Sequence, residues 1–339
     1  MTSQPIRVAI DAMGGDYAPA EIVRGAVLAA REHHVTPLLV GPPAIVEESL
    51  KAHDTRGLSI EIVAASEVID MGDSPTTSLR KKKDASISVT ARCVKNGNAQ
   101  AMVAAGSTGA AMAAALLTLG RLEGVDRPAI GVVLPSLAAP CLLLDAGANA
   151  DCAPHMLLQF GRMGSVFMHN VYGVERPRVG VLNIGEELGK GNALAHAAYE
   201  LLSQDPALNF IGNIEGNDLF CGNADVAVCD GFVGNVALKS VEGVSKMLMT
   251  HLKQELTAHW LTSLGAMMIK PALRSARGKV DPNEHGGALL LGVRGVCVIA
   301  HGSSNANAIV NAVRVAKHAV ESDVLGKMGG RLLESAGCS

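Results

Sequence analysis

The sequence predicts an α/β protein with a largely parallel sheet covered by helices on both faces. Short apolar runs alternate with segments of helical length from one end of the chain to the other. These runs lack the strict alternation of polar and apolar residues that a half-exposed strand shows. Apolar residues make up 48% of the 339 positions, which is enough to fill a large core. Buried strands separated by helices indicate parallel pairing with helical crossovers.

The apolar runs are expected to form strands because each is short, rich in aliphatic residues and bounded by turn-forming residues. In chain order they are Ile6–Ile10, Pro37–Val40, Ser59–Val63, Ala101–Ala104, Ile130–Leu134, Leu142–Leu144, Val179–Leu182, Phe210–Ile214, Val226–Cys229 and Val296–Ile299.

Helices are expected between most of these strands, and the clearest are Pro19–Arg31, Ala44–His53, Ala110–Leu119, Asp151–Tyr172 and Asn192–Leu202. No linker, low-complexity tail or internal repeat interrupts the pattern. We therefore expect residues 1–339 to form one α/β catalytic unit.

Residues 240–285 depart from the pattern because helical spacing continues there without a strand. Apolar residues recur every four positions, a ladder that drifts about 40° per step around a helix. A turn near Ser263–Gly265 would split the segment into an amphipathic helical hairpin that projects from the unit. The segment could be buried at a subunit interface, or it could touch a membrane surface, since basic residues beside Trp and Met suit a lipid interface. The ladder and its basic residues are Val244, Leu248, Leu252, Leu256, Trp260, Leu264 and Met268, with Lys246, Lys253, Lys270, Arg274 and Arg277.

Composition narrows the class of protein. The formal net charge is −3 and no basic stripe dominates, which argues against nucleic acid as a partner. The run Arg80–Lys83 is the exception; it is either a solvated surface or a site for an acidic partner. The 7 cysteines form no C-x-x-C pair, as is usual for reduced thiols in the cytoplasm. The sequence shows neither a signal-peptide pattern nor an apolar stretch of membrane-spanning length, so we expect a cytoplasmic protein.

Residues 225–239 carry the strongest chemical signal. An apolar run ends at Asp230-Gly231, continues through Gly234-Asn235, and becomes a helical pattern that carries Lys239. Free backbone N–H groups and the helix dipole at such a junction attract anions. Similar strand-to-helix junctions occur at Asp11–Pro19, Ala105–Ala110, Asp145–Asn149, Asn183–Gly191, Gly212–Asp218 and His301–Asn305.

The carboxyl ends of parallel strands meet at one edge of a sheet, so we expect these junctions to line one cleft. Their side chains and amides suit phosphate. The sequence lacks clustered Cys and His, H-E-x-x-H and G-x-G-x-x-G, which argues against zinc and a nicotinamide cofactor. The segment around Ser107 differs by one residue from a G-x-S-x-G nucleophile elbow, because Ala105 stands in place of the first glycine.

These junctions, together with Arg127–Ile130, resemble in order the motifs of the bacterial phosphate acyltransferase family PlsX, over nearly the whole chain. The resemblance implies a fold like that of isocitrate and isopropylmalate dehydrogenases and a homodimer. It also implies an enzyme that converts acyl-[acyl carrier protein] and inorganic phosphate to acyl phosphate and free carrier protein. The product would pass to a membrane glycerol-3-phosphate acyltransferase in phospholipid (phosphatidic acid) biosynthesis. Ser107 and Leu188-Gly189 depart from the expected pattern, which leaves the direct roles of those side chains open.

The resemblance and the chemistry together assign roles. Attack of phosphate on a thioester needs positioning and charge neutralisation, and it requires neither ATP nor a metal or other cofactor. Lys190 and Lys239 would bind the phosphate or the oxyanion, Asp230, Asn213 and Asn235 would orient them, and His301 would protonate the leaving sulfur. The remaining binding candidates are Asp11, Gly14, Gly15, Asp16, Ser107, Thr108, Gly109, Asn149, Glu215, Gly231, Ser303 and Ser304.

Three other functions are compatible with parts of the sequence. Ser107 and His301 could form a serine-type thioesterase. The fold could belong to a β-decarboxylating dehydrogenase. The chain could also be a non-catalytic adaptor for a carrier protein or a membrane.

Overall fold

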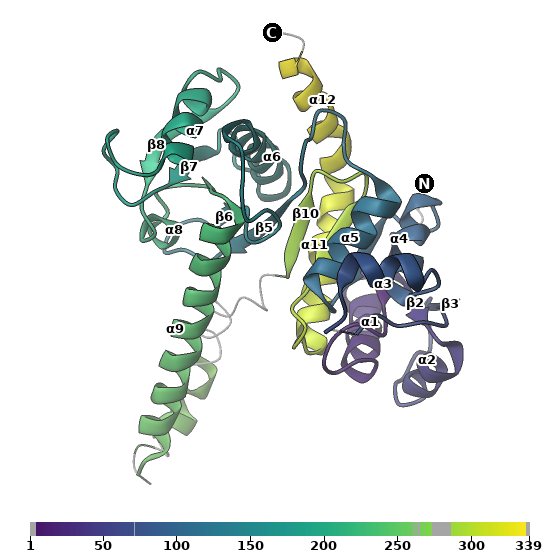
Figure 1. Cartoon of the computed structure of the whole chain (residues 1–339). Helices are drawn as coiled ribbons and strands as arrows, with labels where there is room; N and C mark the ends of the chain where they lie inside the picture. Colours follow the sequence, from purple (N-terminus) through teal and green to yellow (C-terminus); the bar gives the residue numbers. More distant parts are fainter. Residues whose placement is uncertain (1–4, 71, 260–261, 263–264, 273–285, 337–339) are drawn as a thin grey trace.

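The computed structural model describes residues 5–70, 72–259, 262, 265–272 and 286–336. They form one 11-stranded sheet with helices on both faces, in the order β3-β2-β1-β4-β11-β10-β5-β6-β9-β7-β8 (Figure 1). The predicted fold class is confirmed. The strands are β1 (Arg7–Asp11), β2 (Thr36–Gly41), β3 (Glu61–Ala64), β4 (Ala101–Ala104), β5 (Ala129–Leu134), β6 (Cys141–Leu144), β7 (Arg178–Leu182), β8 (Asn209–Ile214), β9 (Val226–Val228), β10 (Ala288–Leu291) and β11 (Val296–Ile299).

The first half of the sheet contains β3, β2, β1, β4 and β11, which all run parallel. Residues at alternate positions of each strand point to opposite faces, so both faces must be covered. One face packs against α1 (Ala20–His33) and α11 (Ala306–Glu321). The other packs against α4 (Ser86–Lys95) and α5 (Thr108–Leu119), with α3 (Pro75–Lys81) at its periphery, whereas α2 (Pro43–Leu50) lies beside α1 on the first face.

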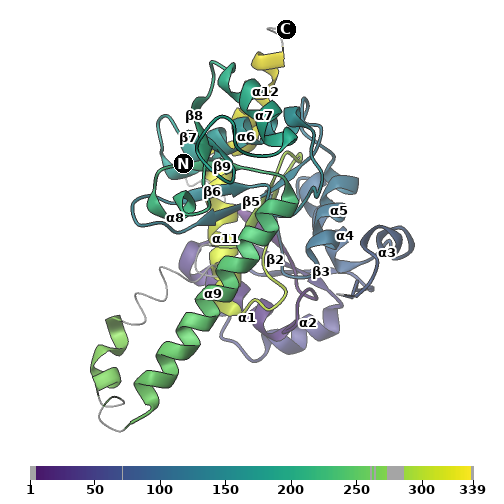
Figure 2. The same cartoon turned by 60° about the vertical axis from the view of Figure 1, so that its left-hand side comes forward.

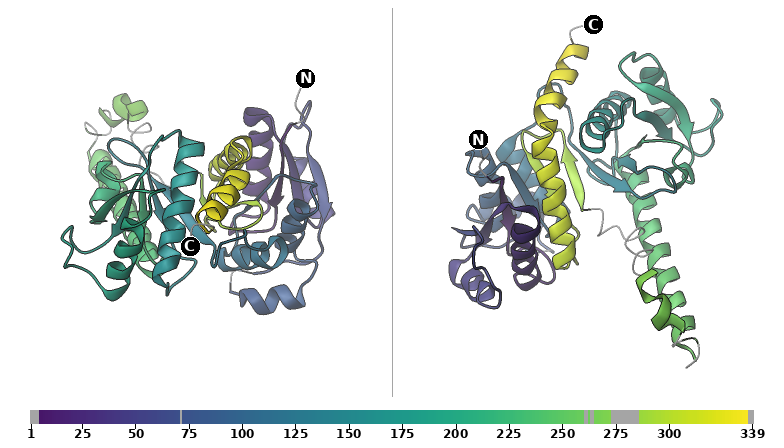
Figure 3. Two further views of the ribbon diagram at one scale, coloured as in Figure 1. Left: turned by 90° about the horizontal axis from the view of Figure 1, so that it is seen from above. Right: turned by 180° about the vertical axis from the view of Figure 1, so that it is seen from behind.

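The second half contains β6, β9, β7 and β8, which are also parallel to one another. Its faces are covered by α6 (Pro154–Tyr172) and α7 (Ala193–Ser203) on one side, and by α8 (Asp218–Cys221) and the start of α9 (Gly231–Thr257) on the other. Figure 3 shows the two halves side by side, with α11 and α12 (Val324–Ala336) lying between them.

The centre of the sheet is antiparallel. The pairs β11–β10, β10–β5 and β5–β6 each reverse the chain direction. Along the hydrogen-bonded ladder, the second half therefore runs opposite to the first. The expectation that all the junctions leave one edge of a parallel sheet is wrong, because an odd number of reversals separates the halves.

Helix α9 leaves the second half and projects from the body of the protein (Figure 2). Only Gly231, Gly234 and Leu238 on it are buried, and Val244, Leu248 and Leu252 of the apolar ladder are exposed in the single chain, at 58%, 61% and 38% accessible. Residues 265–272 are helical, whereas Trp260 and most of the predicted turn lie outside the described residues. No helix within the described residues is long and apolar enough to cross a membrane.

The strands predicted from the sequence are all present within two residues at each end. Strand β10 was not predicted, because Ala288–Leu291 is a four-residue run that lies directly after the paired glycines Gly286-Gly287. The helical pattern after Asp230 is one continuous helix as far as Thr257.

Candidate active site

The chain segments that follow β1, β4 and β11 lie in close backbone contact, and glycines make this close approach possible. A Cβ atom on Gly14 would lie 3.0 Å from the backbone N of Gly106. A Cβ atom on Gly15, whose φ is +105°, would lie 2.9 Å from the carbonyl O of Ala105 and 3.0 Å from that of Gly302. Only glycine fits such a contact at this φ. We call Gly14, Gly15, Gly106 and Gly302 the glycine junction.

Two aspartates flank the paired glycines. The buried Asp11 accepts a hydrogen bond from the Met13 N–H at 3.1 Å, and burial raises the pKa of its carboxyl despite hydrogen bonds from Ser86 and from backbone amides. Asp16 is exposed, and its N–H donates to the Gly302 carbonyl at 2.8 Å. The buried Asp11 therefore stabilises the turn through its hydrogen bonds, while the Asp16 side chain faces solvent.

The start of α5 borders the glycine junction. Ser107 caps this helix, because its Oγ accepts a hydrogen bond from the Ala110 N–H at 3.4 Å. Within the described part of the chain, the N–H groups of Thr108 and Gly109 donate to no protein acceptor. The positive end of the helix dipole adds to these donors, so this helix start can hold an anion.

His301 follows β11 and meets Lys239 of α9. The Nε2 atom of His301 lies 3.4 Å from Nζ of Lys239, and its Nδ1 atom lies 2.8 Å from Oγ of Ser303. The Lys239 ammonium can only donate to Nε2, and the Ser303 N–H also donates to Nδ1 at 3.2 Å, so each ring nitrogen faces a donor and these contacts do not assign the ring proton. Lys239 also donates to Oε2 of Glu242 at 2.7 Å, an (i, i+3) contact on the exposed surface of α9.

The contact between Lys239 and His301 joins the two halves of the sheet. Strands twist by about 20–25° per neighbour, so the four steps from β11 to β9 rotate them by roughly 80–100°. Helix α9 then carries Lys239 about 12 Å from Gly231, at 1.5 Å per residue. The twist of the sheet between β11 and β9, together with the length of α9 up to Lys239, accounts for the position of this lysine beside the C-terminal end of β11.

Asp145 organises a second cluster, after β6. It is fully buried, and its carboxylate accepts hydrogen bonds from the N–H groups of Ile130, Ala148 and Asn149 at 2.7–3.0 Å. Burial raises its pKa, although these donors oppose the shift. The Asn149 amide is also engaged, because Nδ2 donates to Asp145 at 2.9 Å and to the Pro128 carbonyl at 2.8 Å. Sequence reasoning noted this loop but did not select Asp145, since a buried acceptor cannot be distinguished locally from a surface turn residue.

The start of α9 is less open to anions than the sequence indicates. The Gly231 N–H donates to the Asn149 carbonyl at 2.7 Å, and the Val233 and Gly234 N–H groups donate to Asp230, at 2.8 and 3.0 Å. Asp230 is therefore the N-cap of the helix. Asn235 is exposed, and its side chain lies beside Gly147. The expected phosphate donors at 231–235 are mostly occupied by protein.

Lys190 belongs to a third cluster, formed by the loops after β7 and β8. Its carbonyl accepts a hydrogen bond from Asn183 at 3.0 Å, and its side chain is exposed. Asn213 donates to the Glu187 carbonyl at 3.3 Å, and its Oδ1 is buried without a partner among the described residues. Glu215, half-buried, begins the turn into α8. The contacts of this cluster stay within its own loops and do not link Lys190 to Lys239.

Ser303 and Ser304 complete the loop after β11. Ser303 fixes the ring of His301, as described above. Ser304 is buried, its N–H donates to the His301 carbonyl at 2.9 Å, and its Oγ has no partner in the described part of the chain. The described residues contain no group of three His, Cys, Asp or Glu side chains placed to hold a metal ion.

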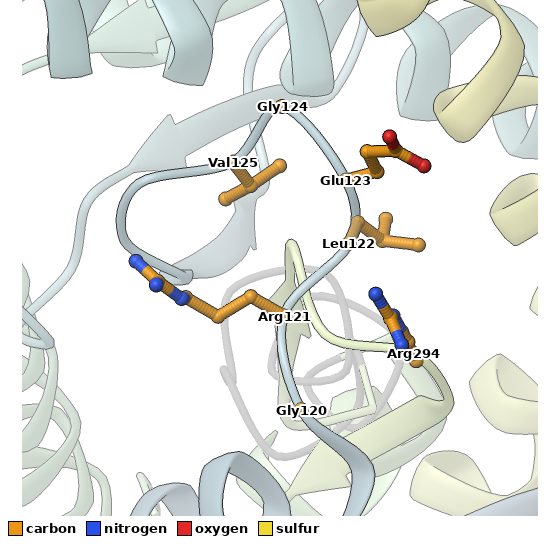
Figure 4. A pocket seen from close by; sticks show the side chains of 7 residues that line it. All are labelled: Gly120, Arg121, Leu122, Glu123, Gly124, Val125 and Arg294. Atoms are coloured by element: carbon orange, nitrogen blue, oxygen red, sulfur yellow. The ribbon is translucent and has the colours of Figure 1, made fainter.

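A separate cavity of about 400 Å³ lies at the turn between β10 and β11, lined by residues 120–125 and Arg294 (Figure 4). The Arg121 side chain donates to the Asp126 carbonyl across the loop that lines this cavity. The turn is at the end of β11 opposite to His301, so this cavity contains none of the predicted site residues.

Comparison with curated proteins identifies close relatives. The family model described as "Fatty acid synthesis protein" matches residues 6–327. A phosphate acyltransferase of Heliobacterium modesticaldum is 56% identical over 321 residues, which cover 94% of this chain and 96% of that protein. One from Pelotomaculum thermopropionicum is 52% identical over 320 residues, covering 94% and 93%.

Comparison with solved structures supports the fold. A phosphotransacetylase from Streptococcus pyogenes aligns with a TM-score of 0.63 and 16% identity, over 94% of each chain. A 4-hydroxythreonine-4-phosphate dehydrogenase from Burkholderia phymatum aligns with a TM-score of 0.52 and 15% identity, over 93% of this chain and 98% of that one. At these identities the similarity concerns the fold alone.

Proposed function

The chain belongs to the fatty acid synthesis protein family, whose curated relatives are phosphate acyltransferases, and we propose that it transfers an acyl group from acyl-[acyl carrier protein] to inorganic phosphate. The products are acyl phosphate and free carrier protein, and the acyl phosphate enters phospholipid biosynthesis through a membrane glycerol-3-phosphate acyltransferase. The reaction exchanges one activated acyl compound for another, so it uses no cofactor.

The contact between Lys239 and His301 beside the glycine junction supports this assignment most. In the proposed site, phosphate lies between the free amides of Thr108 and Gly109 and the ammonium of Lys239. Such donors hold the dianion against the thioester carbon, and they stabilise the negative oxygen that develops during attack. The glycine junction lets the substrate lie flat against the backbone of the strand tips.

We propose that His301 transfers one proton from the attacking phosphate to the departing thiolate. Monohydrogen phosphate attacks the thioester carbonyl and forms the new C–O bond, and collapse of the tetrahedral intermediate breaks the C–S bond. The phosphate hydroxyl loses the proton that the departing thiolate gains. In the proposed relay, the neutral imidazole of His301 accepts this proton at its unprotonated ring nitrogen and then passes it to sulfur. The predicted proton donor is thus also the acceptor.

The other predicted residues support the site in different ways. Asp230 and Asn149 hold the start of α9, while Asn235 lies over the Asp145 loop. Lys190, Asn213 and Glu215 remain assigned to phosphate or acyl binding on the basis of the sequence. Their loops follow β7 and β8, which neighbour β9 in the sheet, so a bound acyl donor long enough to cross both halves would reach them.

The decisive experiment incubates the purified protein with acyl-[acyl carrier protein], with and without inorganic phosphate. We expect thiol release only with phosphate, together with an acyl phosphate that hydroxylamine traps. Thiol release that is independent of phosphate would contradict the assignment and favour the thioesterase. The contacts weigh against that alternative, because Ser107 Oγ caps α5 while His301 Nδ1 faces Ser303.

We propose that the protein is a cytoplasmic homodimer that touches the membrane through residues 240–285. The exposed apolar residues of α9 and Met267 and Met268, which are 67% and 80% accessible, need a partner surface. A second copy would cover the part near the body, and the far end, with its methionines and lysines, would contact lipid.

A further inference from the structure

We propose that an exposed basic turn at the end of α3 is the docking site for the acidic protein that delivers the acyl thioester. The basic turn consists of Arg80, Lys81 and Lys83. The inference rests on the proposed function, because it assumes that the acyl donor is attached to a protein.

Helix α3 stands out from the first half of the sheet beside α5 (Figure 2). Leu79 is its buried residue, and Lys82 anchors its end, donating to the Val68 carbonyl at 2.7 Å and to Asp73 at 2.9 Å. The side chains of Arg80, Lys81 and Lys83 are exposed, and no acidic side chain in the described residues pairs with them. The fold therefore uses one of the four cations in this run and leaves three for solvent.

Two of the acidic residues near the turn, Asp73 and Asp84, are already engaged. Asp73 pairs with Lys82, and this hydrogen bond lowers the pKa of Asp73. Asp84 accepts hydrogen bonds from Ser66 and lies 3.4 Å from Arg92. Three unpaired cations within four residues thus form a local positive patch on a chain whose net charge is −3. Such a patch steers an acidic surface toward it and fixes its orientation.

The turn is close to the proposed phosphate site. A Cβ atom on Gly109 would lie 3.1 Å from Cγ of Pro75, so the first residue of α3 touches the start of α5. From Pro75 to Lys81 the helix rises about 9 Å. The basic turn therefore lies one short helix away from the start of α5 and its free amides. A protein docked at the basic turn would present its thioester beside the proposed phosphate site.

The test compares two acyl donors on the full-length protein. The charge-reversed variant Arg80→Glu/Lys81→Glu/Lys83→Glu is assayed with acyl-[acyl carrier protein] and with acyl-N-acetylcysteamine, a small thioester without a protein. We expect KM for the carrier-protein donor to rise at least 10-fold with kcat within about twofold, and the rate with the small thioester to stay within twofold. The matched control Lys51→Glu/Lys95→Glu/Lys327→Glu makes the same charge change at exposed lysines elsewhere, and it should behave as the wild type.

The remaining outcomes separate the hypotheses. An unchanged KM with the carrier-protein donor, or an equal loss with both donors, overturns the docking site but leaves the phosphate acyltransferase assignment intact. Absence of acyl phosphate from either donor in the wild type overturns the proposed function itself. Weaker binding to anionic phospholipid vesicles with an unchanged KM would make the basic turn a lipid contact instead. If the variant is insoluble, KM of the wild type between 50 and 300 mM NaCl decides, because docking requires a rise for the carrier-protein donor alone.

Discussion

Lys239 and His301 lie 3.4 Å apart through Nζ and Nε2, although they follow strands that run in opposite directions along the sheet. The contact is the direct link between the two halves of the protein at the proposed active site. Its chemistry depends on the lysine being a donor and the imidazole being an acceptor.

Replacing Lys239 with alanine should lower kcat/KM for phosphate by about 10²-fold, the effect of removing one charged stabiliser from an active site. Steady-state assays of acyl phosphate formation at varied phosphate measure it. Lys246→Ala is the matched control, since Lys246 lies seven residues further along α9 on its exposed surface. The parallel variant Lys190→Ala tests whether the third cluster reaches the same phosphate. A near-normal Lys239→Ala enzyme would remove the phosphate site proposed here.

Replacing His301 with glutamine should lower kcat by about 10²–10⁴-fold, the range for loss of a general acid–base group. Ser303→Ala should have a smaller effect, because it removes only the hydroxyl that contacts Nδ1 at 2.8 Å and helps to orient the ring. Its expected signature is a changed pH profile of kcat with KM for phosphate preserved. If His301→Gln retained full activity with a normal pH profile, the proton relay would be excluded.

The sequence predicts the strands and the polar residues at their tips well, because these features are local. The sequence does not predict which strand ends lie next to one another in the folded protein. Two of the three antiparallel pairs at the centre of the sheet involve β10, a four-residue run with no helix before β11, and the third pairs β5 with β6 across a short loop. The contact between Lys239 and His301 depends on sheet twist and on the length of α9, which are properties of the whole fold. Asp230 and Gly231 have the composition of an anion site, yet Asn149, 82 residues earlier in the chain than Gly231, already accepts the Gly231 N–H.

Replacing Gly15 with alanine should destabilise the protein by about 1–3 kcal/mol and reduce activity. Gly15 has φ of +105°, and a methyl group would meet the carbonyl oxygens of Ala105 and Gly302. Urea unfolding followed by circular dichroism measures the free energy of unfolding. Gly216→Ala is the control, because a Cβ atom there has no neighbour within 4 Å. Equal stabilities of the two variants would mean that the strand tips are not held as closely as the glycine junction requires.

Replacing Asp11 with asparagine should change how stability depends on pH. Burial raises the pKa of Asp11 in the folded protein, so its contribution to stability is fully present below its unfolded pKa and is lost as pH rises through the folded pKa. Asparagine does not titrate. The difference in free energy of unfolding, variant minus wild type, should therefore increase from pH 4 to pH 8 in urea titrations. A difference that stays constant over this range would show that Asp11 does not titrate differently in the folded and unfolded chains.

Replacing Met267 and Met268 with glutamate should weaken binding to anionic phospholipid vesicles and leave activity on a water-soluble thioester unchanged. Both side chains are more than half exposed and lie beyond the end of α9, far from Lys239 along the chain. Charges on this surface oppose its transfer into the lipid interface, whereas they do not alter the phosphate site. Vesicle sedimentation measures binding, and light scattering measures the mass of the particle. The control Val244→Glu/Leu248→Glu changes the apolar ladder nearer the body, and it should dissociate the dimer instead. If the methionine variant becomes monomeric and the ladder variant loses vesicle binding, the two surfaces have the opposite assignments.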